Sequence, residues 1–565
     1  MLNMDRLSRR HFLGAAAATA MFGTACGPAA SQAGPTLRPE DHGAVGDGRA
    51  DDRRALQAWL AAPAGTHALT AGKTYRIAVG PGDAGNVLLP IARAVRLIGH
   101  GATILIADGA GPYFAILGQK DPAVDLTGLW VEGVTFDHNA ARGRGFTTGA
   151  EQEGVLDAPR HTIYVKRGRR FDFLRNLVRN VATTNAVVYN GDGNTSNCRV
   201  NENRFQNVGA VPGGVYHDHS TLYLTGDGIE AAGNQFEASG WGAPGAVCAI
   251  EVHPGTGCTI RDNRITGFHT GINYAGVYEH DSRQGVIAGN VIEALRRGIA
   301  VYSIRYLGHV AGFGVDDLAI DGNRIQIRNA LPRGRMSGGG PGAFGIGIVG
   351  GASLAVRNVV IGGGNEIRFD LETAPPDWDS LPAGVMLGET DGTTLFEEIR
   401  IGDVTVVNSP VFGITVGLGG GRFRNCSIGR PHLLNCGSTA RPDDTLGSVD
   451  YRSAIWIAPH AFEGSFRVAG ARIEDNLPVA RLVNAIVLSA DVASNAEVEL
   501  NFDVALRGQR QSYRRAIRSL DGRIVPLARI SQDRGAIEVD ANARFRPGST
   551  LTDRASGRVS APPGR

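Results

Sequence analysis

The stretch CTIRDNRITG, residues 258–267, places an asparagine, Asn263, two residues before an apolar residue, Ile265. Six other stretches share this arrangement, and the seven asparagines follow one another at intervals of 27 to 42 residues. Such a regular series indicates an internal repeat. The seven pairs are Asn176 and Val178, Asn203 and Phe205, Asn234 and Phe236, Asn263 and Ile265, Asn290 and Ile292, Asn323 and Ile325, and Asn365 and Ile367.

Each repeat contains two or three short strands with alternating polarity and no helix-length periodic segment. Parallel strands normally need a crossover helix, and the exception is a solenoid whose coils stack on one another. We therefore predict an all-β fold, a right-handed parallel β-helix with coils of roughly 22–30 residues, over residues 111–545. A β-sandwich of short strands is the alternative, but it would not explain the constant position of the asparagine.

The asparagines have a predicted role at one corner of each coil. Asparagine tolerates the left-handed conformation that a tight bend needs, and its amide can bond to the asparagines above and below. The apolar residue two places further on is expected to point into the stacked interior.

A short helix is predicted near the start of the chain, in DHGAVGDGRADDRRALQAWLAA (41–62). Gly46 and Gly48 permit a tight turn, and Asp51 or Asp52 is expected to cap the helix. A phosphate loop would need GK[ST], and an EF-hand loop would need a glutamate at its twelfth position, so we interpret these acids as structural. The face that covers the first coil is predicted to contain Ala55, Leu56 and Trp59.

This segment resembles the N-terminal part of the pectate-lyase-like parallel β-helix superfamily, which includes polysaccharide lyases and relatives of glycoside hydrolase family 28. The matching stretches are HGAVGDG (42–48), Asp51–Asp52, Ala55–Gln57 with Arg53 in place of a threonine, AGKTYRI (71–77) and VRLIGHGATI (95–104). The resemblance covers residues 38–105. It implies that residues 35–110 form a cap and the first coils, and that the ligand is a carbohydrate polymer.

The first 34 residues have the layout of a twin-arginine export signal. SRRHFLG (8–14) is followed by an apolar run too short to span a bilayer. Cys26 is a candidate site for a lipid anchor, and cleavage near Ala25 or Ala33 is the alternative. The mature protein is therefore expected outside the cytoplasm, in the periplasm, anchored to a membrane or secreted.

Composition excludes some partners. The formal net charge of +2 gives no reason to expect a nucleic acid, and the 79 glycines fit many tight turns between strands. The six cysteines form no CxxC motif, so they are expected to be single buried thiols, with Cys248–Cys258 and Cys426–Cys436 as candidate disulfides. No cofactor is expected, since no motif supports calcium. Residues 546–565 are predicted to be a disordered tail.

Strand alternation predicts which side chains face outward along one wall of the solenoid. The asparagine spacing places Tyr223 beside Glu251 and Thr225 beside His253 in neighbouring coils, and histidines cluster in and around these strands. We predict catalytic roles for Tyr223, Glu251, His253, Asp218 and His219, and substrate binding by Lys166, Tyr164, Asn273, Tyr274, Tyr302, Arg305 and Asp192. No metal ligands are predicted.

Two reactions fit these residues. In β-elimination on a uronate, Tyr223, His253 or His219 would transfer protons while Asn273 and Lys166 stabilise the developing charge. In hydrolysis, Glu251 and Asp218 would be the paired carboxylates. The sequence favours an exported polysaccharide lyase, with a glycoside hydrolase as the alternative.

A non-catalytic glycan-binding surface protein and a glycan epimerase remain further alternatives. A phage tailspike is disfavoured, because a virion protein needs no export signal. The sequence identifies neither the glycan, the linkage nor the oligomeric state.

Overall fold

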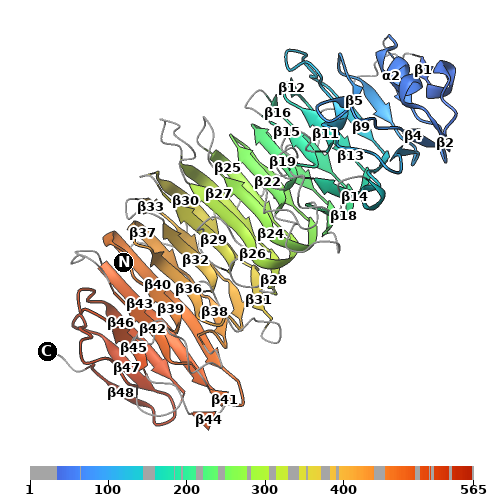
Figure 1. Ribbon diagram of the computed structural model, residues 1–565. Helices are drawn as coiled ribbons and strands as arrows, with labels where there is room; N and C mark the ends of the chain where they lie inside the picture. Colours follow the sequence, from blue (N-terminus) through green and yellow to red (C-terminus); the bar gives the residue numbers. More distant parts are fainter. Residues whose placement is uncertain are drawn as a thin grey trace.

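The structure, a computed structural model, is a long stack of coils, and its described part has one α-helix, at the N-terminal end of the stack (Figure 1). This arrangement confirms the right-handed parallel β-helix. The strands of each coil pair in parallel with those of the coils before and after it. The structure describes residues 35–63, 65–143, 160–183, 185–191, 195–210, 220–238, 248–275, 282–303, 314–328, 343–351, 354–370, 382–389, 394–437, 452–480, 482–489, 497–507, 509–510, 515–533 and 537–562.

Three parallel sheets run along the stack. The first, which we call the site sheet, consists of β5 (Val87–Pro90), β8 (Ala115–Gly118), β11 (His161–Val165), β15 (Val188–Asn190), β19 (Ser220–Gly226), β22 (Cys248–Pro254), the second halves of β24 (Arg264–Ala275) and β26 (Val291–Ser303), β29 (Phe344–Gly350), β32 (Ala383–Glu389), β36 (Phe412–Leu418), β39 (Ser453–Ile457), β42 (Asn484–Leu488) and β45 (Arg515–Ser519).

The second sheet precedes the asparagine turn in each repeat. It consists of β1 (Thr36–Leu37), β3 (Thr66–Ala68), β6 (Arg96–Ile98), β9 (Trp130–Glu132), β13 (Asp172–Leu174), β17 (Arg199–Asn201), β20 (Glu230–Ala232), β23 (Thr259–Arg261), β25 (Ser282–Ala288), β27 (Val315–Asp321), β30 (Val356–Ile361), β33 (Leu395–Glu397), β34 (Arg400–Ile401), β37 (Arg422–Ile428) and the first half of β40 (Ala461–Asp475).

The third sheet follows the asparagine turn. It consists of β2 (Asp47–Asp51), β4 (Thr74–Ile77), β7 (Thr103–Ile106), β10 (Thr135–Asp137), β14 (Leu177–Thr183), β18 (Arg204–Ala210), β21 (Gln235–Ala238), the first halves of β24 and β26, β28 (Arg324–Ile327), β31 (Glu366–Phe369), β35 (Thr405–Val407), β38 (His432–Leu434) and the second half of β40. Strand β43 (Glu497–Leu506) pairs with the whole of β40. Two short pairs lie apart from these sheets, β12 (Gly168–Arg169) with β16 (Thr195–Ser196) and β41 (Val479–Ala480) with β44 (Gln509–Arg510).

The predicted asparagine ladder is present between the second and third sheets. Asn263 Oδ1 accepts hydrogen bonds from the backbone N and the Nδ2 of Asn234, both at 3.0 Å. Asn263 Nδ2 donates to the Ala231 carbonyl at 2.8 Å and to Asn290 Oδ1 at 2.9 Å. The same bonds connect successive members from Asn176 to Asn365, and the apolar residues two places further on are buried.

The left-handed residue of each turn differs from the prediction. It is the residue before the asparagine, as at Asp262 (φ 57°) and Gly233 (φ 65°), and not the asparagine itself. The preceding residue makes the bend, so the asparagine side chain can point into the turn and bond along the stack.

The cap at the N-terminal end consists of the 3₁₀ turn η1 (Pro39–His42) and helix α2 (Arg53–Ala61). Leu56 and Trp59 of α2 are buried against the first coil, as predicted. Asp52 occupies the N-cap position, but its carboxylate accepts from the backbone N of Val45 (2.6 Å) and Gly46 (3.1 Å) instead of capping the helix. The acids of this segment therefore hold the turn, which agrees with their structural interpretation.

The far end of the stack differs from the predicted disordered tail. Strand β46 (Leu527–Gln532) pairs in parallel with β47 (Thr550–Asp553), which forms an antiparallel hairpin with β48 (Arg558–Ser560). The five cysteines among the described residues are free and buried, so neither candidate disulfide forms. Cys26 and the export signal lie outside the described residues.

Candidate active site

The site sheet brings together most of the predicted functional residues that the structure describes. Strand pairing aligns Tyr164, Tyr189, Tyr223, Glu251 and Asn273 on successive coils. The pairing of Tyr223 with Glu251 and of Thr225 with His253 matches the register expected from the asparagine spacing. Alternation works as predicted, because the intervening residues are fully buried in the core: Ile163, Val165, Leu222, Leu224, Ile250 and Val252.

Three tyrosines stack along this sheet, and we call Tyr164, Tyr189 and Tyr223 the tyrosine ladder. The ring centroids of Tyr164 and Tyr189 lie 4.8 Å apart at an interplanar angle of 18°, and those of Tyr189 and Tyr223 lie 5.1 Å apart at 1°. These separations match the spacing between neighbouring strands, so each coil contributes one ring. At one end of the ladder the Phe114 ring meets the Tyr164 ring edge to face, with centroids 4.8 Å apart at 76°.

His161 supports the ladder from the side. Its ring lies 5.3 Å from that of Tyr164 and 5.5 Å from that of Tyr189, and its Nδ1 lies 2.5 Å from the Ala186 carbonyl. Burial lowers the His161 pKa to about 4, so the ring is neutral near pH 7. A neutral ring holds the tyrosines in place without adding charge to this surface.

Glu251 and His253 follow the ladder at its other end. His253 Nε2 lies 3.3 Å from Glu251 Oε1, and the His253 ring centroid lies 4.9 Å from that of Tyr223. The Ser220 hydroxyl donates to Glu251 Oε2, and Asn273 Nδ2 donates to Glu251 Oε1 at 3.4 Å. Although it faces outward, Glu251 is only 8% exposed. The carboxylate is thus held in one position beside an imidazole.

Tyr302 lies two coils beyond His253 on the same face. Tyr302 pairs with Ala275 on the coil between them, and Ala275 lies beside His253 because the preceding residues, Tyr274 and Val252, pair with each other. The Tyr302 hydroxyl accepts a hydrogen bond from Arg297 Nη1 at 2.9 Å. Burial raises the Tyr302 pKa, and the Arg297 charge opposes that rise. Arg297 therefore brings a positive charge to the end of the site opposite the tyrosine ladder.

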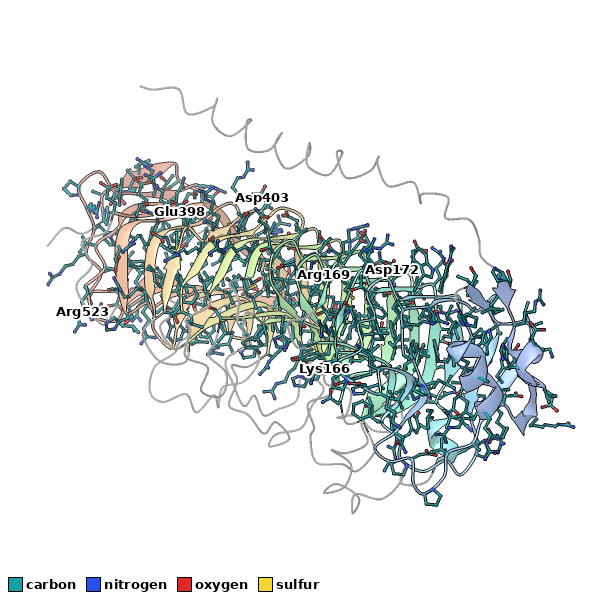
Figure 2. The ribbon with its side chains drawn as sticks, turned by 90° about the horizontal axis from the view of Figure 1, so that it is seen from above. Lys166, Arg169, Asp172, Glu398, Asp403 and Arg523 are labelled. Carbon is teal, nitrogen blue, oxygen red and sulfur yellow. The ribbon has the colours of Figure 1, made fainter. Side chains whose placement is uncertain are left out.

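The structure separates one predicted residue, Tyr274, from this cluster. Tyr274 is fully buried, with its hydroxyl 2.5 Å from Ser282 Oγ, so the substrate-binding role predicted for it is wrong. The reason is strand alternation, which points Ile272 and Tyr274 inward and Asn273 outward. Lys166 lies on the coil of Tyr164, at the far end of the ladder, three strand spacings or about 14 Å from the coil of His253. Figure 2 shows Lys166 on the opposite long side of the stack from Glu398 and Asp403.

Several other predicted residues lie outside the described residues: Asp192, Asp218, His219 and Arg305. Three residues of the site were missed in the sequence, namely Tyr189, Ser220 and Arg297. Tyr189 was detectable as an aromatic residue before an asparagine of the repeat, but it precedes Asn203 by 14 residues, whereas Tyr223 precedes Asn234 by 11. Nothing in the sequence pattern distinguishes Ser220 or Arg297.

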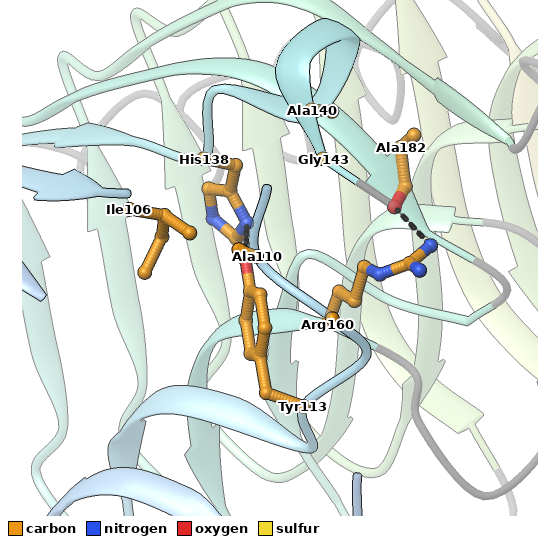
Figure 3. A pocket seen from close by; sticks show the side chains of 9 residues that line it. Ile106, Ala110, Tyr113, His138, Ala140, Gly143, Arg160 and Ala182 are labelled. Carbon is orange, nitrogen blue, oxygen red and sulfur yellow. Dashed lines mark hydrogen bonds between the residues drawn. The ribbon is translucent and has the colours of Figure 1, made fainter. Parts of the chain in front are cut away.

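A small cavity of about 20 Å³ lies beside the start of the ladder, where the third sheet turns into the site sheet (Figure 3). The Tyr113 hydroxyl lies 2.6 Å from His138 Nδ1, and His138 Nε2 lies 2.6 Å from Thr162 Oγ1. Burial lowers the His138 pKa to about 3, so the neutral ring accepts from one of these two hydroxyls and donates to the other. Since these groups satisfy one another, we assign this network to folding.

Two absences apply to the described part of the chain. No group of three or more histidine, cysteine, aspartate or glutamate side chains there is placed to hold a metal ion. None of its helices is long and apolar enough to cross a membrane.

Comparisons with known proteins show what this fold is similar to. A scan against protein-family models finds no match, and neither does a search of the curated proteins. Among solved structures, the tailspike protein of E. coli bacteriophage HK620 is similar in two variants, each in complex with a pentasaccharide. A glutamate-to-glutamine variant is 16% identical with a TM-score of 0.58, and an aspartate-to-asparagine variant is 17% identical with a TM-score of 0.56. Both alignments cover 91% of this chain and 80% of the tailspike chain.

The catalytic unit of a GH87 α-1,3-glucanase from Streptomyces thermodiastaticus also matches, at 14% identity and a TM-score of 0.41, over 87% of this chain and 70% of that chain. At these identities the comparisons establish the fold and nothing more. The chain has the right-handed parallel β-helix fold that these structures share.

Proposed function

We propose that this protein is a polysaccharide-cleaving enzyme that binds a glycan on the site sheet and breaks it next to Glu251. The observation that carries the proposal is the Glu251–His253 pair at the end of the tyrosine ladder. A carboxylate oriented against an imidazole is a general acid–base pair, and aromatic and hydroxyl groups beside it suit a sugar chain. The oligosaccharide complexes of the similar tailspike protein agree with such a ligand.

Hydrolysis is the reaction that the geometry supports best. β-Elimination on a uronate needs positive charge beside the substrate carboxylate, because negative charge develops there in the transition state. The group beside His253 is instead the Glu251 carboxylate, which would repel a substrate carboxylate, and Lys166 is about 14 Å away. In hydrolysis a held carboxylate is what the chemistry requires.

One further observation bears on hydrolysis. In the similar tailspike structures, a pentasaccharide is bound to variants in which one carboxylate is replaced by an amide. Such variants are consistent with carboxylate chemistry on this fold. Hydrolysis needs a second carboxyl group, and we propose Asp218 for that role, with His219 as a further catalytic residue and Asp192 and Arg305 as glycan-binding residues.

β-Elimination is the second candidate. It is favoured by the contact of His253 with the Tyr223 ring, since a base and a phenol together could remove a proton and protonate the leaving oxygen. Asn273 would then stabilise the substrate carboxylate, and Arg297 would supply positive charge.

A polysaccharide panel tests the proposal and separates the two reactions. Hydrolysis is expected to release reducing ends without the ultraviolet absorbance of an unsaturated uronate, whereas elimination produces both. Parallel assays with a chelator test the expectation that no metal is needed. Binding without cleavage of any glycan would overturn the enzyme proposal in favour of a glycan-binding surface protein, and a changed sugar configuration in an uncleaved chain would identify an epimerase.

We also propose that the chain is exported by the twin-arginine route, with Cys26 as a lipid anchor. The support is the sequence SRRHFLG and the following apolar run. Replacing Arg9 and Arg10 by lysine should retain the protein in the cytoplasm, while Cys26→Ala should release it from the membrane fraction. Export that is unchanged by the arginine replacement would contradict this route.

A further inference from the structure

The tyrosine ladder presents ring edges and hydroxyls to a ligand and not ring faces. At centroid separations of 4.8 and 5.1 Å and angles of 18° and 1°, the rings cover each other's faces. No sugar ring fits between them, so stacking of a sugar on these faces is excluded. What remains accessible is a row of ring edges and phenol groups, one per coil.

Gly191 shows where this row lies. A Cβ at Gly191 would be 2.5 Å from Tyr189 Cζ and 2.6 Å from the Tyr189 hydroxyl oxygen, so the ring leans along its own strand over the glycine. Asn190 pairs with Leu224, so the next residues, Gly191 and Thr225, lie side by side on neighbouring strands. Thr225 in turn pairs with His253, so Gly191, Thr225 and His253 form one outward-facing row across the strands. The hydroxyl ends of the ladder therefore lie in line with His253.

We infer that the ladder binds one sugar unit per coil, so that the substrate is an extended, equatorially linked glycan lying parallel to the axis of the stack. This inference rests on the proposed function. An extended pyranose chain advances by a length close to the strand spacing with each sugar, so one sugar lies opposite each tyrosine. Successive sugars of such a chain are turned over, so neighbouring phenol groups, which both donate and accept, meet alternate hydroxyl edges of the chain. A helically coiled glycan curves away from a straight row and loses contact with the more distant tyrosines.

The register sets a dependence on chain length. The coils of Tyr223, Tyr189 and Tyr164 lie one, two and three spacings from Glu251. A short oligosaccharide bound at Glu251 reaches only Tyr223, and a longer one also reaches Tyr164. Each phenol hydroxyl should contribute about three- to tenfold in affinity.

Binding to an inactive variant tests this inference independently of cleavage. Calorimetry on Glu251→Gln would use cello-, chito- and mannuronate oligosaccharides as extended probes and malto-oligosaccharides as the helical probe, from dimer to hexamer. Adding Tyr223→Phe should weaken every extended probe that binds, whereas Tyr164→Phe should weaken only the longer ones. Tyr274→Phe is the matched control, because its hydroxyl faces the interior and its loss should not alter affinity.

The outcomes separate the two levels of the proposal. Equal effects of Tyr164→Phe on short and long probes, tighter binding of the malto-series, or no binding of any extended probe would overturn the one-sugar-per-coil inference. Cleavage by the wild type together with any of these results would leave the enzyme proposal intact. Full activity of Glu251→Gln would instead overturn the proposed function.

Discussion

His253 Nε2 lies 3.3 Å from Glu251 Oε1, and both side chains belong to one strand, β22. Residues two apart on a strand face the same side, so the backbone itself holds the pair together. Ser220 from the preceding coil and Asn273 from the following coil bond to the same carboxylate. The position of the Glu251 carboxylate is thus determined by three adjacent coils.

Replacing Glu251 by glutamine is expected to reduce kcat about 10²- to 10⁴-fold, because it removes the acid–base function while keeping the shape. His253→Ala should reduce kcat by a similar factor. The double variant should be little worse than the poorer single one, since residues that act as a unit are not additive. Steady-state kinetics on the cleaved glycan provides the measurement.

A matched control for this pair is Glu230→Gln. Glu230 lies on the second sheet and forms an ion pair with Arg261 at 2.9 Å, away from the site sheet. Its replacement should leave kcat and KM unchanged. If Glu230→Gln slowed the enzyme as much as Glu251→Gln, loss of a charge anywhere would explain the effect and the assignment of the pair would be wrong.

The asparagine ladder should make a large contribution to stability. Asn263→Ala removes the oxygen that accepts from the backbone N and the Nδ2 of Asn234. It also removes the Nδ2 that donates to the Ala231 carbonyl and to Asn290 Oδ1, and all four bonds are buried. Leaving such groups unsatisfied is expected to lower the free energy of unfolding by about 3 kcal/mol. Denaturant unfolding measures this. The control Asn86→Ala removes an exposed bond to Gly82 and should change stability by less than about 0.5 kcal/mol.

The asparagine spacing explains why part of the site could be predicted. It sets the register of β19 on β22, and alternation then places Tyr223, Glu251 and His253 on one wall. The spacing failed at Tyr189, because the turn between the site sheet and the second sheet is longer in that coil. Tyr274 was assigned to the surface against its own alternation, and the bond from Ser220 depends on a side-chain conformation that no periodicity encodes.

Gly191→Ala is expected to displace the Tyr189 ring, since the new Cβ would lie 2.5 Å from Tyr189 Cζ. Affinity for the longer extended oligosaccharides should fall about tenfold while the unfolding midpoint changes little. The effect should vanish in a Tyr189→Ala background, where nothing remains to be displaced. Gly82→Ala is the matched control, because a Cβ there meets nothing within 4 Å. Equal loss of affinity in both backgrounds would show that Gly191 does not act through Tyr189.

Buried histidines should make the fold sensitive to mild acid. Burial lowers the pKa of His138 to about 3 and of His161 to about 4, from an ordinary value of 6.5. The unfolded chain therefore binds protons below pH 6.5 that the folded chain does not, and stability present above that pH is lost as the pH falls towards 4. Each such histidine should contribute a slope of about 1.4 kcal/mol per pH unit over this window.

His138→Gln tests this dependence, because an amide has both a donor and an acceptor for the Tyr113 and Thr162 hydroxyls but does not titrate. Compared with the wild type, the variant should lose less stability between pH 6.5 and pH 4, by about 1.4 kcal/mol per pH unit. Denaturant unfolding at a series of pH values supplies the slopes. His42→Gln, at the half-buried last residue of η1 and outside this network, is the control and should leave the slope unchanged. Identical slopes for His138→Gln and the wild type would mean that His138 titrates normally in the folded protein and that burial does not exclude its charge.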